Sequence, residues 1–181
     1  MIRTPLSLFA CLAFAAAAFA QPKDAIKKVE ASFEPAEAKP GQTVTLKIVV
    51  RLADGYHTYP LVQPTPEAKY SVNKVTFPPA DAVVFVGTTS DPDGAKLKKG
   101  EDHEYLTYPG GGTWTRKAVV SPTAKPGEAK VKVQFRLLVC DENRCFPPKT
   151  IDLEPTMKVL DGPAVPVEAK YKAEVEKAGK K

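Results

Sequence analysis

Apolar residues recur at every second position over two segments of the chain, and this pattern restricts the fold more than any other feature of the sequence. Apolar side chains occupy every second position from Val44 to Leu52, and again from Val131 to Val139. Successive side chains of a β-strand point to opposite faces, so each segment is predicted to be a strand with one buried face. Each follows a Pro-Gly turn, Pro40-Gly41 in the first case and Pro126-Gly127 in the second.

Weaker strand patterns occur in five further segments, namely 26–33, 70–77, 82–86, 114–120 and 150–160. The 18 prolines and 11 glycines of the chain punctuate the spaces between them. About seven short strands with turn signals and little helix predict an all-β protein, an immunoglobulin-like β-sandwich. A small β-barrel is the structural alternative.

Two segments fall outside this pattern. Gly87 to Gly112 is a long polar stretch with two glycine-containing turn signals, and it is predicted to be a functional or disordered loop. The stretch from Glu168 to Lys181 is rich in Lys, Glu and Ala, so we expect a frayed end or a short helix without chemistry.

The first twenty residues have the pattern of a signal peptide. Arg3 precedes an apolar stretch from Leu6 to Phe19, and Ala18-Phe19-Ala20 fits a cleavage site before Gln21. Lipid attachment at Cys11 is an alternative, although Phe9 fits a lipid-attachment box poorly. We therefore expect a periplasmic or secreted protein that is soluble after cleavage.

The remaining chain suits one domain, predicted over 21–165, followed by a charged C-terminal tail over 166–181. The net charge is +5, but lysines alternate with apolar residues on the predicted strands, as on a solvated sheet face. Without a compact basic patch or a known binding motif, a nucleic-acid partner is not expected. We expect a monomer that is not embedded in a membrane.

Cleavage would leave two cysteines, Cys140 and Cys145, in an environment where disulfides persist. Continuing the alternation of the preceding strand places Cys140 with Arg136 and Leu138 on the outer face. A four-residue loop would then return the chain and bring Cys145 nearly opposite Cys140. The sequence thus predicts a disulfide on a hairpin.

Two interpretations of this disulfide stay open, a thiol–disulfide relay and a structural crosslink. Closing a ring of about six residues stabilises a fold by roughly 2 kcal/mol, against about 4.7 kcal/mol for a 100-residue loop. The short ring therefore favours a redox role. Arg144 would favour the thiolate of Cys145, whereas Asp141 and Glu142 would disfavour that of Cys140, which suggests Cys145 as the exchanging sulfur.

Metal binding and hydrolysis are weaker hypotheses. His57 and His103 could join the two cysteines in a Cys₂His₂ site, but their spacing gives no metal signal. A copper site of cupredoxin type would need a methionine, and Met157 is the only one after the signal peptide. No Ser-His-Asp or paired-carboxylate pattern indicates a hydrolase, and no cofactor is expected.

Three motifs resemble the N-terminal periplasmic domain of the DsbD thiol:disulfide interchange family. The first is Cys140 to Pro148, with two cysteines followed by Phe-Pro-Pro. The second is Asp54-Gly55-Tyr56-His57-Thr58-Tyr59, and the third, looser one is His103-Glu104-Tyr105 with Tyr108. The likeness runs from about Val29 to Leu160.

The resemblance implies an immunoglobulin-like sandwich that relays electrons by dithiol–disulfide exchange. Its partners would be thioredoxin-like domains and a membrane electron-transfer protein, each engaged through a transient mixed disulfide. By this resemblance Cys145 would engage partners and Cys140 would resolve the mixed disulfide, with Tyr56 and Tyr59 flanking the pair and Tyr105 shielding it.

One departure from the family bears on the partners. Full-length members continue into a transmembrane domain and a thioredoxin-like domain, and this sequence does not, so we expect it to work with separate partners. The alternative function is a non-catalytic binding or adaptor module with a structural disulfide, which would present the 87–112 segment or a sheet edge to a protein or a glycan.

Overall fold

The computed structural model describes residues 24–100 and 102–179, and the predicted signal peptide lies outside them. The strands in these residues are β1 (Ile26–Glu34), β2 (Glu37–Ala38), β3 (Thr43–Leu52), β4 (His57–Thr58), β5 (Lys74–Thr76), β6 (Val83–Ser90), β7 (Lys96–Lys99), β8 (Glu104–Pro109), β9 (Gly111–Val120), β10 (Gly127–Lys130), β11 (Val133–Leu137), β12 (Lys149–Leu153) and β13 (Thr156–Val159). The helices are η1 (Pro66–Ala68), η2 (Ala169–Tyr171) and α1 (Lys172–Ala178).

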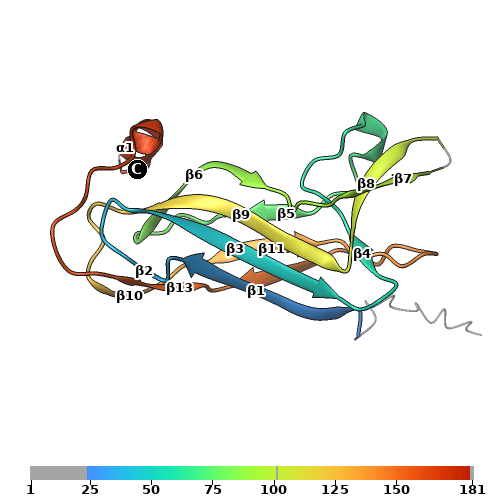
Figure 1. Ribbon diagram of the computed structural model, residues 1–181, viewed down its shortest axis with the longest axis horizontal. Coiled ribbons are helices and arrows are strands. Elements are labelled where there is room, and N and C mark those ends of the chain that lie inside the picture. The colour runs from blue at the N-terminus through green and yellow to red at the C-terminus, as the bar shows by residue number, and fades with distance from the viewer. Residues whose placement is uncertain (1–23, 101, 180–181) are drawn as a thin grey trace, which may run out of the picture.

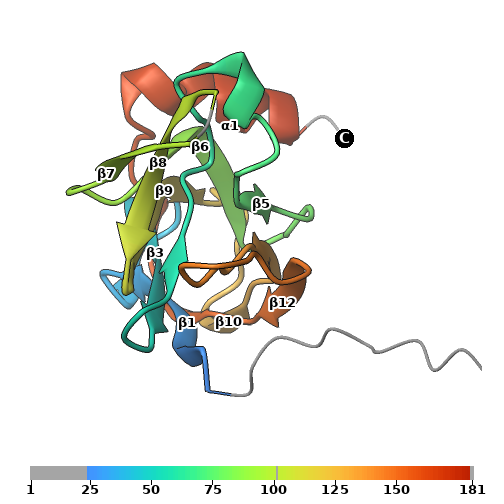
Figure 2. The ribbon, with the colours of Figure 1, turned by 90° about the vertical axis from the view of Figure 1, so that its right-hand side faces the viewer.

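The strands form four sheets, with the orders β1-β3-β9-β6, β10-β13-β2, β12-β11-β5 and β4-β8-β7. All neighbours are antiparallel except β13 and β2. The four-stranded sheet makes one layer, and the strands β10, β13 and β11 run behind it as the second layer (Figures 1 and 2). The immunoglobulin-like β-sandwich predicted from the alternation is confirmed.

The core lies between these layers. The inward positions of β3 and of the segment around β11 are almost fully buried, as their alternation predicts; they are Val44, Leu46, Ile48, Val50, Val131, Val133, Phe135, Leu137 and Val139. The ring of Trp114 on β9 lies 5.2 Å from that of Phe135 on β11, measured between centroids. This contact joins the two layers across the middle of the core.

The prediction of a loop from Gly87 to Gly112 is wrong. β6 continues to Ser90, β7 and β8 form an antiparallel hairpin, and β9 begins at Gly111. Polar strands of this kind carry little hydrophobic signal in the sequence, because every residue of β7 is exposed. The three-stranded sheet β4-β8-β7 stands at one end of the sandwich, on the right of Figure 1.

Other predicted elements differ in their bounds. The strand expected over 70–77 is confined to β5, because the turn after η1 holds Ser71, whose N–H donates to the carbonyl of Ala68. The segment 150–160 splits into β12 and β13 at Pro155, which has no N–H to donate. The predicted C-terminal tail contains the short helix α1, which packs against β6 through the buried Val175.

No helix within the described residues is long and apolar enough to span a lipid bilayer.

Candidate functional site

The two cysteines form a disulfide on a tight hairpin that follows β11. Their Cα atoms lie 4.0 Å apart. The N–H of Asp141 donates to the carbonyl of Arg144, and the N–H of Phe146 donates to that of Val139. These bonds flank the cysteines, which makes them a non-hydrogen-bonded antiparallel pair, the position at which opposed side chains come closest. The predicted hairpin and its disulfide are therefore present.

Asp141 shapes the turn of this hairpin. Its Oδ1 atom accepts the backbone N–H groups of Asn143 and Arg144, each at 2.8 Å. These two hydrogen bonds are the main reason that the pKa of Asp141 lies below its usual value. The guanidinium of Arg144 sits over the ring of Phe146, 5.0 Å from its centroid, and 4.0 Å from Asp141. Arg144 thus anchors the turn beside the pair.

The two cysteines differ sharply in exposure. Cys145 is exposed, whereas Cys140 is 1% exposed. Cys140 does share its strand face with Leu138, as the alternation predicts, but that face is covered by Tyr59 and Tyr105, so the expectation of an outward-facing Cys140 is wrong. The cover comes from segments distant in the sequence, which alternation along a single strand cannot reveal. One cysteine is exposed and the other is enclosed.

Tyr59 contacts both sulfurs. Its hydroxyl donates to Sγ of Cys140 at 3.1 Å and lies 3.4 Å from Sγ of Cys145. Burial, with a smaller contribution from Tyr105, raises the pKa of Tyr59 to about 12. The phenol therefore stays protonated at neutral pH and keeps a hydrogen to donate. Tyr59 is the side chain that lies over the disulfide.

His57 extends this contact. Its Nε2 atom lies 3.2 Å from the Tyr59 hydroxyl, and the two rings meet edge to face. The backbone of His57 also pairs with that of Cys140 through two N–H···O bonds of 3.0 Å. The pKa of His57 is lowered by burial and by Lys98, while Asp141 acts in the opposite direction. His57 and Tyr59 are two positions apart, so in an extended segment their side chains lie on the same face. This relationship could have been predicted from the sequence.

Asn73 fixes the two segments that carry Tyr59 and Cys140. Its side-chain carbonyl accepts the N–H of Leu138 at 2.9 Å, and its amide donates to the carbonyl of Tyr59 and to the hydroxyl of Thr58. Thr58 in turn donates to the carbonyl of Leu138 at 2.7 Å. Both side chains are buried. No sequence pattern marks Asn73, because its partners are 14 to 65 residues away.

The other predicted aromatic residues lie around the disulfide in different ways. Tyr105 on β8 is half-buried against the cluster of Tyr59, Leu138 and Cys140, with its ring centroid 6.2 Å from that of Tyr59. Tyr56 instead packs on Phe146, at 6.2 Å between ring centroids. Tyr105 thus lies beside the buried sulfur, while Tyr56 supports the base of the hairpin.

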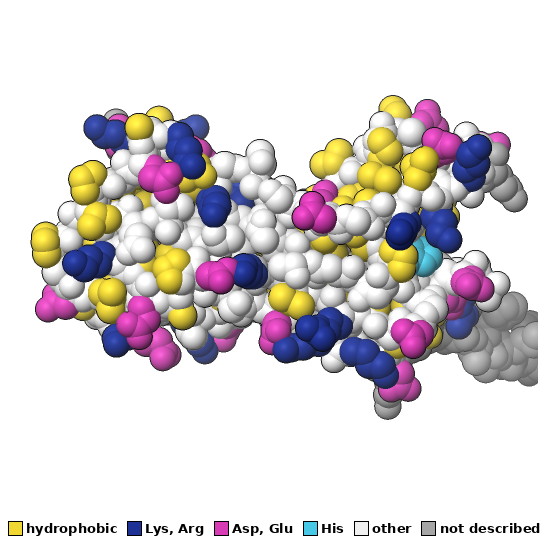
Figure 3. All heavy atoms as spheres, viewed as in Figure 1, with side chains coloured by type: hydrophobic (Ala, Val, Ile, Leu, Met, Phe, Trp, Pro, Cys, Tyr) yellow, Lys and Arg dark blue, Asp and Glu magenta, His cyan; other side chains and the backbone are white. Residues whose placement is uncertain are grey.

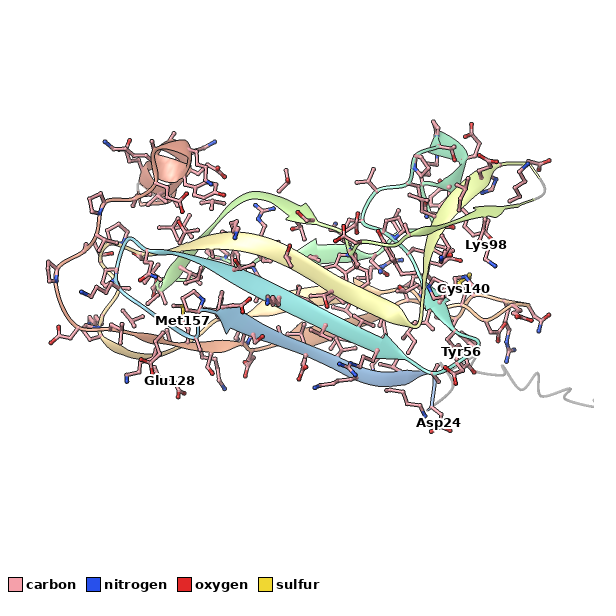
Figure 4. All side chains as sticks on the ribbon, viewed as in Figure 1. Asp24, Tyr56, Lys98, Glu128, Cys140 and Met157 are labelled. Carbon is pink, nitrogen blue, oxygen red and sulfur yellow. A yellow bond between two sulfur atoms is a disulfide. The ribbon has the colours of Figure 1, made fainter. Side chains whose placement is uncertain are left out.

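The β7–β8 hairpin lies at the same end of the sandwich as the disulfide. Lys98 pairs with Tyr105 in the register of this hairpin, so both side chains share one face. Figure 4 shows Lys98, Cys140 and Tyr56 at the same end of the molecule. In Figure 3 a notch opens at this end between two protruding parts, with a histidine side chain on its wall. The disulfide is therefore placed at an open end of the sandwich.

The metal hypotheses find no support in the described ranges 24–100 and 102–179. These residues contain no group of three or more His, Cys, Asp or Glu side chains able to hold a metal ion. Met157 is buried in the core at the end of the molecule opposite Cys140 (Figure 4). It is therefore not placed to complete a copper site with the cysteines.

Two solved structures are similar to this chain at low identity. One is the N-terminal periplasmic domain of ScsB from Proteus mirabilis, with 14% identity and a TM-score of 0.45 over 83% of this chain and 52% of that chain. The other is a cohesin–dockerin complex, Coh-OlpA-Doc918, from Clostridium thermocellum, with 13% identity and a TM-score of 0.41 over 74% of this chain and all of that one.

This chain thus spans about half the length of the ScsB structure. The sequence matches no family model and no curated protein. Neither structural likeness is close enough to imply a shared function.

Proposed function

We propose that this protein is an exported thiol–disulfide exchange protein that works through the Cys140–Cys145 pair. The observation that carries the proposal is the asymmetry of the disulfide: Cys145 is exposed at an open end, while Cys140 is buried beneath the hydroxyl of Tyr59. Exchange requires a sulfur that a partner can reach and a second sulfur within bonding distance. It requires no cofactor.

The position of the disulfide supports exchange over a purely structural role. It links residues five apart within a hairpin whose own backbone hydrogen bonds already close the turn. In the chain-entropy model so short a ring contributes only about 2 kcal/mol. A crosslink between the two layers would constrain the unfolded chain far more.

Reduction would begin when a thiolate of a partner dithiol attacks Sγ of Cys145. The partner–Cys145 bond forms, the Cys140–Cys145 bond breaks, and Cys140 leaves as a thiolate. The partner's second thiol then attacks the partner's first sulfur, the one bonded to Cys145 in the mixed disulfide. This closes the partner's disulfide and releases Cys145. Two electrons pass from the partner, which ends as a disulfide, to this chain, which ends as a dithiol.

The compartment and partners belong to the same proposal. The signal-peptide pattern of the first twenty residues supports export to the periplasm or beyond. The donor would be a thioredoxin-like domain or a membrane electron-transfer protein, and the acceptors would be exported oxidoreductases. Each would be engaged in turn through a transient mixed disulfide.

Trapping with single-cysteine variants tests the proposal. A thioredoxin-fold protein that has lost its resolving cysteine, activated as a mixed disulfide with a chromophoric thiol, would be offered to Cys140→Ser and to Cys145→Ser. We expect Cys140→Ser, which keeps the exposed Cys145, to form the covalent complex much faster. Equal rates for the two variants, or no complex with either, would favour the adaptor with a structural disulfide.

A further inference from the structure

We propose that His57 is a positioning residue that passes protons between solvent and the buried sulfur of Cys140 through the hydroxyl of Tyr59. The inference rests on the proposed exchange function and adds a proton path to it. Tyr59 touches the reacting sulfurs, whereas His57 acts only through Tyr59.

Three groups lie in one hydrogen-bonded row. Nε2 of His57 is 3.2 Å from the Tyr59 oxygen, and that oxygen is 3.1 Å from Sγ of Cys140. A phenol hydroxyl can accept one hydrogen while donating its own, so the row can run from imidazole to sulfur in one direction. The paired backbones of His57 and Cys140 hold the two ends of the row in register.

The burial of Cys140 is what makes such a path necessary. When the disulfide breaks, the leaving sulfur becomes a thiolate at a position that is 1% exposed. A buried charge without a partner is costly, and little water can reach this sulfur to protonate it. His57 is only half-buried, so its ring connects the enclosed sulfur with solvent.

The proton that Cys140 gains on reduction is then accounted for, and the exposed Cys145 takes its proton from solvent when the partner releases it. As the partner thiolate attacks Cys145 and Cys140 leaves, the Cys140 thiolate takes the hydrogen of Tyr59. Tyr59 takes the Nε2 hydrogen of the His57 imidazolium, and the neutral His57 regains a proton from water. In the oxidising direction Cys140 gives its proton back along the same row before it attacks the mixed disulfide.

Charged groups from two other elements face His57. Lys98 on β7 disfavours its protonation, and Asp141 in the turn after Cys140 favours it. Burial is the largest influence and lowers the pKa of His57 in the disulfide form, which favours the neutral ring. A thiolate forming at Cys140 would favour the imidazolium, which is the direction that the relay needs.

The test is the pH dependence of disulfide reduction by dithiothreitol in the full chain. Each rate is divided by the fraction of dithiothreitol present as thiolate, which removes the reagent's own titration. For the wild type we expect this corrected rate to rise by about 10-fold as the pH falls from 7 to 5, because protonated His57 supplies the proton to the leaving sulfur.

The variants separate the relay from general electrostatics. His57→Gln keeps a side-chain N–H but cannot titrate in this range, so its corrected rate should be flat. Tyr59→Phe should be flat and slower throughout. His103→Gln is the matched control, because His103 contacts Tyr105 rather than Tyr59, and it should behave as the wild type. Circular dichroism checks folding, and His57→Asn serves if glutamine is not accommodated.

A wild-type pH profile that survives in His57→Gln would overturn the relay, and so would its loss in His103→Gln. Either result leaves the exchange function standing if the partner is still trapped on Cys145. A disulfide that is reduced only after unfolding would contradict the exchange function itself, so the two failures are distinguishable.

Discussion

The hydroxyl of Tyr59 donates a hydrogen bond to Sγ of Cys140 at 3.1 Å, across 81 residues of sequence. Through this contact the residue that follows β4 helps to bury Cys140, whereas Cys145 is exposed. The phenol can do this only while it is protonated, and its raised pKa, about 12, ensures that it is.

Stability above pH 10 should depend on Tyr59. Because the pKa of Tyr59 is raised in the folded state from its usual 10, its contribution is complete below about pH 10 and is lost as the pH rises through about 12. We expect the free energy of unfolding of the wild type to fall by roughly 1–3 kcal/mol more than that of Tyr59→Phe over this range. Urea melts at several pH values measure this difference. Tyr70→Phe, at a tyrosine that is 79% exposed, should retain the wild-type slope.

Alkylation of the reduced protein should distinguish the two cysteines. Cys145 is exposed and Cys140 is buried under Tyr59 and Tyr105, so iodoacetamide should modify Cys145 first. Mass spectrometry of peptides cut between the cysteines, at Arg144, gives the two rates separately. Tyr105→Ala should raise the rate at Cys140 by uncovering it, whereas Tyr70→Ala should not. Equal rates at the two cysteines in the wild type would contradict the enclosure of Cys140.

Replacing Asn73 should destabilise the site end of the protein. Asn73→Ala leaves the N–H of Leu138 and the carbonyl of Tyr59 buried without their partner, and we expect a loss of about 2–4 kcal/mol in unfolding free energy. Asn143→Ala is the control, because that side chain is exposed in the disulfide turn, and it should cost less than about 0.5 kcal/mol. Similar losses for the two variants would mean that Asn73 does not hold the segments of Tyr59 and Leu138 together.

Gly111 should tolerate a side chain poorly. It has φ +97°, and a Cβ atom there would lie on the carbonyl oxygen of Val50 in β3. Gly94 has a similar φ of +80° but open space around it. We expect Gly94→Ala to cost about 1–2 kcal/mol, from the left-handed backbone alone, and Gly111→Ala at least about 3 kcal/mol, because β3 must also move. Thermal melts of the two variants compare them, and equal costs would contradict the close approach of β3 and β9.

The sequence predicted those parts of the molecule in which a strand meets the core over many residues. Alternation placed the inward faces of β3 and of the segment around β11 correctly, because burial there is set by one dominant core. It could not predict the β7–β8 hairpin, whose outer strand Lys96–Lys99 is exposed throughout and is held by backbone hydrogen bonds. A strand that is held only by backbone hydrogen bonds needs no alternation of apolar and polar residues, so the sequence gives no pattern for it.

The sequence also predicted part of the functional site. The cysteine spacing predicted the hairpin disulfide, and the resemblance drew attention to Tyr59 and Tyr105. The burial of Cys140 was missed because its cover comes from β8 and from the residues after β4. His57 could have been recognised from its alternation with Tyr59, whereas the role of Asn73 depends on partners that only the folded chain brings together.

The reduction potential of the Cys140–Cys145 disulfide distinguishes an exchange protein from a protein with a structural crosslink. The protein without its first twenty residues would be equilibrated with glutathione or thioredoxin redox buffers, and the dithiol fraction would be measured by mass after alkylation. We predict a potential between roughly −180 and −270 mV, the range of exchange proteins. A value below about −300 mV would mark a structural disulfide and would contradict the proposed function.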